Sequence, residues 1–346
     1  MKLPRIEPII ATLILAGQLV MTGAPANACS RVLWNDNTNA VVVGRNMDWF
    51  TPMPVDLYIL PRGMQRSGLT GKNTLEWTSK YGSVTTAGSD GINEKGLALQ
   101  ALWLAESDYG KYDQAKPGLG VTLWPQFYLD KFATVKEAVA YTQKNPFQVA
   151  SSEFEGRKLT IHLSLADASG DSAVIEFLDG KAKIYHSREH TVMTNSPTYD
   201  KQLERLKQYK GFGGERDLPG STEAADRFVR GAYYLKGLPD PKNTREAIAG
   251  IMSVMRNVSQ PFSKGDSTTP NRSQTRWRTV ADLTNKVYYF ESSNNPFLVW
   301  VDLKLLDFSA DKDVRRVDLI NHPDRLGNVT EQAEASEFYD TLPPTF

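Results

Sequence analysis

The stretch GAPANACSRVLWNDN, residues 23–37, contains Cys29, the only cysteine of the 346-residue chain. The small residues Ala26 and Ala28 stand before it in the A-x-A pattern that a signal peptidase reads. The pattern predicts cleavage between Ala28 and Cys29. Cleavage would make Cys29 the first residue of the mature chain, so that one residue would carry both a thiol and a free α-amino group.

Residues 1–28 have the other features of a secretory signal. Lys2 and Arg5 give a positive start, and the apolar run IIATLILAGQLVM (9–21) follows. A membrane anchor is the alternative, but the run is short for a span and is interrupted by a glycine and a glutamine. We therefore expect residues 1–28 to be removed. Residues 29–346 would then be a single domain in the periplasm or secreted, without stable membrane insertion.

The composition excludes several other classes of protein. Forty basic and forty acidic residues balance, which argues against nucleic acid or an anionic membrane surface as the partner. His186 and His190 lie four apart, but the chain has no HExxH motif and no second cysteine, so we expect no metal and no cofactor. The two GDS triplets, at 170–172 and 265–267, do not lie in a G-x-S-x-G elbow, which argues against a serine hydrolase.

A lone cysteine in an exported chain has three interpretations. It cannot form a disulfide within its own chain, which leaves a reactive thiol, a lipid attachment point or an inert buried thiol. An α-amino group has a pKa of about 7.7–8.0, so a free amine can act as the base for its own thiol. A lipoprotein signal normally has a Leu-like residue where this chain has Ala26, yet a lipid-anchored periplasmic binding protein remains the alternative from another class. An inert thiol is less expected directly at the cut.

The residues after Cys29 predict a hairpin that brings charged groups to the thiol. Two β-rich runs, CSRVLW and AVVVG, flank the turn sequence NDNTN. A hairpin centred on the middle Asn pairs Trp34 with Ala40 and sets Arg45 opposite Cys29, where a guanidinium favours the thiolate. Asp48 follows three residues later and is placed to orient the amine. Solvated charges at an ordinary hairpin end are the alternative.

Cys29 after a signal, together with GRNMDW (44–49), resembles the choloylglycine hydrolase family, which contains bile salt hydrolases and penicillin V acylases. That family belongs to the N-terminal-nucleophile hydrolases. Four further segments resemble family motifs in the family's order: DGINEKGLALQALWL (90–104), VMTNSPTYD (192–200), DRFVR (226–230) and the strand-rich segment 275–308.

The resemblance implies a role for each matched residue. Cys29 would be the nucleophile and, through its amine, the base. Arg45 would lie near the sulfur, Asp48 would hold the amine, Asn195 would donate its side-chain amide to the oxyanion, and Arg227 would complete the polar network. The resemblance also implies an α+β fold, a four-layer αββα sandwich of two antiparallel sheets between helix layers. It further implies a small acyl amide as substrate and a homo-oligomer, often a tetramer.

Trp49 and Trp103 indicate which branch of the family the chain resembles. The family's second oxyanion donor falls at Trp103, where bile salt hydrolases have Asn and many penicillin V acylases have Tyr. An indole N–H is aimed away from the backbone, so we expect the backbone N–H of Trp103 to be the donor. Trp at position 103 and directly after Asp48, at position 49, resembles the Gram-negative branch of the family. Members of that branch are associated with penicillin V and N-acyl homoserine lactones. Conjugated bile salts are the alternative substrates.

Aromatic residues in the long segments 49–58 and 106–120 are candidates to line an acyl pocket. We expect Trp49, Phe50 and Trp103 there, and core packing is the alternative for Phe50. The remaining patterns predict an α+β chain with antiparallel sheets. They give helices over 134–143, 197–210, 221–236 and 244–257, the first of which begins with the capping-box pattern TVKE at 134–137. They also give strands over 159–166, 173–178, 286–292 and 297–303.

Overall fold

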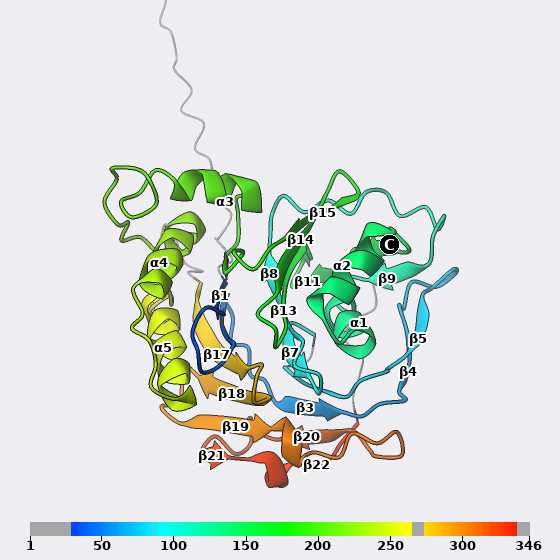
Figure 1. The fold of residues 1–346 in the computed structure, drawn as a ribbon. Coiled ribbons are helices and arrows are strands. Elements are labelled where there is room, and N and C mark those ends of the chain that lie inside the picture. The colour runs from blue at the N-terminus through cyan, green and yellow to red at the C-terminus, as the bar shows by residue number, and fades with distance from the viewer. Residues whose placement is uncertain (1–28, 87, 265–272, 338–346) are drawn as a thin grey trace, which may run out of the picture.

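The computed structural model describes residues 29–86, 88–264 and 273–337. Two β-sheets face each other in the middle of the molecule, and helices cover the outer face of each (Figure 1). The predicted four-layer sandwich is therefore confirmed. The predicted signal, residues 1–28, lies outside the described residues. Within the described part of the chain, no helix combines the length and the apolar character needed to cross a membrane.

The predicted nucleophile, Cys29, immediately precedes strand β1 (Ser30–Trp34) of the first sheet. The strand pairs of this sheet are antiparallel except for the outermost, β19 with β21. Its strands, in spatial order, are β16 (Val192–Met193), β1 (Ser30–Trp34), β2 (Val42–Trp49), β17 (Gln274–Asp282), β18 (Val287–Ser292), β19 (Leu298–Asp302) and β21 (Gly327–Asn328).

The second sheet supplies the opposite wall of the space between the sheets. Its strands, in spatial order, are β15 (Lys181–His186), β14 (Ser172–Leu178), β13 (Ile161–Ala166), β8 (Ala98–Trp103), β7 (Asp90–Asn93), β6 (Ser83–Thr85), β3 (Leu57–Leu60), β20 (Arg315–Val317) and β22 (Glu334–Ala335). Three small two-stranded pieces complete the described strands: β4 (Gln65–Ser67) with β5 (Glu76–Thr78), β9 (Gly118–Gly120) with β10 (Gln148–Ala150), and β11 (Glu153–Phe154) with β12 (Arg157–Lys158).

The helices divide between the two outer faces. Helices α4 (Ala224–Lys236) and α5 (Thr244–Asn257) lie over the first sheet, and α3 (Tyr199–Leu206) packs against α4. Helices α1 (Trp124–Lys131) and α2 (Val135–Gln143) lie over the second sheet. Helix α5 packs closely on β2 because Gly44 has no side chain. A Cβ there would lie 2.6 Å from Met255 Cγ.

The first bond of the predicted capping box is present at the start of α2, and the second is shifted by one residue, to the residue before the N-cap Thr134. Thr134 accepts a hydrogen bond from the backbone N–H of Glu137, and Glu137 accepts one from the N–H of Ala133. The other predicted helices and strands are confirmed to within a few residues. Helix α1 was not predicted, because seven of its eight residues are buried and it therefore lacks the one-sided apolar pattern of a surface helix.

The predicted register of the first hairpin is wrong by two residues. Trp34 pairs with Val42, not Ala40, and Arg45 lies opposite Arg31, not Cys29. The cause is Asn37, whose side chain bonds both the N–H and the C=O of Ala40 and so keeps Ala40 in the turn. The longer turn leaves Arg45 on the same face of the sheet as Cys29, two positions along.

Candidate active site

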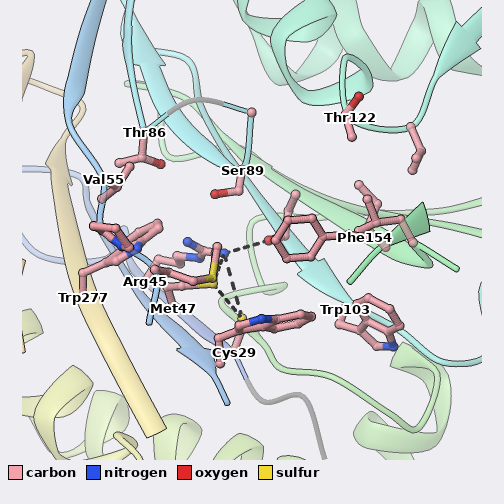
Figure 2. Close-up of a pocket in the computed structure, with 18 residues that line it drawn as sticks. Cys29, Arg45, Met47, Val55, Thr86, Ser89, Trp103, Thr122, Phe154 and Trp277 are labelled. Carbon is pink, nitrogen blue, oxygen red and sulfur yellow. Dashed lines mark hydrogen bonds between the residues drawn. The ribbon is translucent and has the colours of Figure 1, made fainter. Parts of the chain in front are cut away.

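Cys29 immediately precedes β1, and its side chain is 4% exposed. The sulfur lies at one side of a cavity of about 440 Å³ between the two sheets (Figure 2). The lining is mainly aliphatic and aromatic, with a few hydroxyl groups from Thr86, Ser89 and Thr122 on the side away from Cys29. A single thiol therefore faces a mostly apolar space.

Strand β2 contributes to the site from both of its faces, because successive side chains of a strand point in opposite directions. Arg45, Met47 and Trp49 line the cavity. Asn46 and Asp48 point to the other face, where Asn46 donates to the carbonyl of Met255 in α5 at 2.8 Å. Alternating residues of one strand thus line the cavity and contact the helix side of the sheet.

Arg45 lies near the sulfur despite the changed register. Its Nη2 is 3.9 Å from Cys29 Sγ and donates to the carbonyl of Ala101 at 3.0 Å. Its guanidinium carbon lies 4.5 Å from the ring centre of Trp277, which holds the cation over an aromatic face. Burial raises the pKa of the Cys29 thiol, and the charge of Arg45 opposes that rise. Burial therefore opposes formation of the thiolate, and the guanidinium of Arg45 favours it.

The nitrogen of Cys29 lies in a buried polar cluster. In the full chain this nitrogen is a peptide N–H, and it donates to Oδ1 of Asn195. Arg227 Nη2 donates to the same Oδ1 at 3.0 Å, and Arg227 Nη1 donates to the carbonyl of Cys29 at 2.6 Å. Asn195 and Arg227 thus fix the backbone of the nucleophile at its nitrogen and at its carbonyl oxygen.

Asp48 is the buried anion of this cluster. Its Oδ1 accepts from the hydroxyl of Thr275 at 2.5 Å, and its Oδ2 lies 3.6 Å from Arg227 Nη1. Among the described residues, Oδ2 accepts no hydrogen bond. Burial raises the pKa of Asp48 to about 6, although Arg227 opposes the rise. Among the described residues no hydrogen bond joins the Asp48 carboxylate to the Cys29 nitrogen, so the predicted bond from Asp48 to the amine stays a prediction.

Asn195 and Trp103 are neighbours, as the predicted oxyanion site requires, but their groups bond each other. Asn195 Nδ2 donates to the carbonyl of Trp103 at 2.7 Å. The next residue, Leu104, donates its N–H to Thr160, beyond the end of β13. Because alternate N–H groups of a strand point to opposite edges, the N–H of Trp103 points to the edge where Asn195 lies.

The expected pocket residues are only partly correct. Trp49 and Trp103 line the cavity, and their ring centres are 5.8 Å apart. Phe50 does not line the cavity, so the prediction that it is a pocket residue is wrong. Its ring packs against that of Trp49, with the two ring centres 4.9 Å apart. The chain turns out of β2 after Trp49, which takes Phe50 out of the strand's alternation.

Met47, Phe154 and Trp277 also line the cavity and were not predicted from the sequence. The alternation Arg45, Met47, Trp49 along β2 is a signal that would have found Met47. No local signal points to Phe154, which reaches the cavity from a separate hairpin. Among the described residues, no group of three His, Cys, Asp or Glu side chains is placed to hold a metal ion.

The chain matches the profile of the linear amide C–N hydrolases, choloylglycine hydrolase family, over residues 29–317. With Cys29 at an apolar cavity of a four-layer sandwich, this match identifies its class: the chain belongs to that family and is a linear amide hydrolase. The first matched residue is Cys29.

Two penicillin V acylases are similar to the chain over most of its length. The penicillin V acylase of Pectobacterium atrosepticum is 42% identical over 333 residues, which cover 88% of each chain. The structure of penicillin V acylase from Agrobacterium tumefaciens is 44% identical, with a TM-score of 0.82 over 91% of this chain and 99% of that one. A bile salt hydrolase/transferase of Clostridium perfringens is 25% identical over 75% of this chain and 88% of its own length.

Proposed function

We propose that the chain is exported, that cleavage after Ala28 frees Cys29, and that the mature enzyme hydrolyses amides with an apolar acyl group. Penicillin V and N-acyl homoserine lactones are the substrates that we propose. The observation that carries this proposal is the position of Cys29, whose sulfur faces an apolar cavity while its nitrogen lies in a polar cluster. The similarity to two penicillin V acylases supports the acyl half of the substrate. Periplasmic location and a homo-oligomer are part of the same proposal.

The proposed reaction begins with proton transfer from the Cys29 thiol to its own neutral amine. The thiolate attacks the acyl carbonyl carbon and forms a tetrahedral oxyanion. Collapse breaks the C–N bond, and the leaving amine takes its proton from the Cys29 ammonium. Water then attacks the thioester carbonyl and gives a proton to the amine. Collapse breaks the C–S bond and releases the acid, and the thiolate takes the proton back from the ammonium, which restores the thiol and the neutral amine.

The polar cluster is suited to a free amine. A peptide N–H has one donor, whereas an ammonium has three, and Asn195 Oδ1 takes only one of them. Asp48 Oδ2 is a buried acceptor without a hydrogen bond among the described residues, so it can take a second. Asn195 Nδ2 has two N–H bonds and uses one on Trp103, which leaves one for the oxyanion beside the Trp103 N–H.

The test starts with the intact mass of the exported protein. The proposal expects a chain that begins at unmodified Cys29, and expects Cys29→Ala to lower turnover of penicillin V by about 10⁴-fold or more while the fold persists. A mass that includes lipid, or a chain that begins elsewhere, would overturn it. Parallel assays with N-acyl homoserine lactones and conjugated bile salts identify the acyl group. Faster turnover of bile salts than of both other substrates would make the bile-salt alternative correct.

A further inference from the structure

Trp49 is held in place by a residue that does not line the cavity. Its side chain is only 5% exposed, and its indole Nε1 donates to Glu155 Oε2 at 3.0 Å. A buried indole N–H needs such an acceptor. The other carboxylate oxygen, Oε1, accepts from the hydroxyl of Thr51 at 2.9 Å. Glu155 thus binds two residues of the segment at the end of β2, more than a hundred positions earlier in the chain.

Glu155 occupies a backbone position that does not suit a glutamate. Glu155 and Gly156 form the two-residue loop between β11 and β12. The strand pair that closes this loop is Phe154 with Arg157. The φ angles of Glu155 and Gly156 are 49° and 72°, and positive φ at both loop residues is typical of a type I′ turn, which favours Asn, Asp or Gly. A glutamate in the left-handed region is unfavourable, and strain retained in this way is associated with functional sites. The carboxylate is the feature that Asn or Gly would not supply.

The residues on either side of this turn extend the connection. Phe154 lines the cavity (Figure 2), and its ring centre lies 5.7 Å from that of Trp49. Arg157, its cross-strand partner, places its guanidinium carbon 4.4 Å from the ring centre of Phe50. Four contacts from three hairpin residues therefore join the β11–β12 hairpin to the end of β2 and the residues after it, and two of the rings involved, Trp49 and Phe154, are walls of the cavity.

We infer that Glu155 is a specificity-determining residue. By binding Trp49 and Thr51 it fixes the hairpin that carries Phe154, and so it sets the spacing of two aromatic walls and the width of acyl group that fits between them. A flat aryl group needs both rings in position, whereas a straight alkyl chain adapts to a wider gap. This inference rests on the proposed function, because it takes the cavity as the acyl pocket.

The test removes the carboxylate without harming the turn. Glu155→Gly suits the positive φ, so the hairpin is kept while the bonds to Trp49 and Thr51 are lost. We expect the KM for penicillin V to rise about tenfold, with little change in KM for amides of straight-chain acids and with kcat for both within about twofold. Glu155→Gln keeps an acceptor for the indole N–H and should restore most of the selectivity. Glu153→Ala, which removes an exposed carboxylate of the same hairpin, is the matched control.

Binding measurements separate a failure of this inference from a failure of the proposed function. In the Cys29→Ala background, calorimetry compares phenoxyacetic acid with a straight-chain acid, with and without Glu155→Gly. An unchanged ratio of the two dissociation constants would overturn the role of Glu155, as would an equal effect of Glu153→Ala. If the wild-type enzyme hydrolyses none of the amides but the ratio still depends on Glu155, the proposed substrates are wrong and the role of Glu155 stands.

Discussion

The two sides of the nucleophile are built in opposite ways. The polar cluster around the Cys29 nitrogen consists of Asp48, Asn195 and Arg227, all fully or almost fully buried and joined by hydrogen bonds or an ion pair. The cavity beside the sulfur is lined mainly by apolar groups, and Phe154 and Trp103 are partly exposed there. A buried ionic cluster tolerates little change, because each charge depends on its partner. An apolar wall has no such dependence, so we expect large effects in the cluster and small ones in the cavity.

The largest effect is expected from the cation of the cluster. Arg227→Met removes the partner of Asp48 and leaves a buried carboxylate unpaired, which should lower the free energy of unfolding by about 3–5 kcal/mol. Chemical denaturation measures the loss. Arg256→Ala is the control, because the side chain of Arg256 pairs with Glu291 but is 58% exposed. This substitution should lower the free energy of unfolding by at most about 1 kcal/mol. Equal losses in the two variants would remove the contrast.

A smaller effect is expected in how the free energy of unfolding changes with pH. Asp48 has a usual pKa of 3.8 that burial raises to about 6 in the folded chain. Between these values the folded state binds the proton more tightly than the unfolded state, so this group's stabilising contribution is complete below pH 4 and is lost as the pH rises through 6. The loss is at most about 3 kcal/mol, since one pKa unit corresponds to 1.36 kcal/mol. Asp48→Asn should flatten this part of the stability profile.

Denaturation at several pH values between 4 and 7 checks the pH prediction. Asp36→Asn is its control, because it makes the same substitution at a carboxylate that is exposed in the first turn. If Asp48→Asn has the wild-type slope, the carboxylate of Asp48 is not the group that titrates.

The smallest effect is expected in the cavity. Phe154→Ala removes one wall, so the KM for an aryl-acyl amide should rise about tenfold, equivalent to 1.4 kcal/mol, with kcat unchanged. The free energy of unfolding should fall by less than about 1 kcal/mol, because the ring is partly exposed. The control Phe127→Ala empties a core site that is 1% exposed and should cost about 3–5 kcal/mol. A similar cost for both would show that the cavity wall is part of the core.

Local patterns predicted what depends on neighbours along the chain. The capping box of α2 and the strands around Cys29 follow from residues a few positions apart. The hairpin register failed because a single side chain, Asn37, lengthened the turn, and pairing rules based on the strands alone do not include it. The grouping of Asn195 and Arg227 around Cys29 came from the family resemblance. The contact of Trp49 with Glu155 had no signal, because it joins two segments whose proximity is set by the packing of the whole fold.

The alternation of β2 has a consequence for how such enzymes diverge. Positions 47 and 49 face the cavity, while positions 46 and 48 face the helix-covered side of the same sheet. If the cavity is the acyl pocket, substitution at position 47 or 49 can change the acyl group that fits without altering Asp48 or the buried polar cluster. Insertion of one residue within the strand would exchange the two sets at once. We therefore expect relatives to vary the residues of this strand and to keep its length.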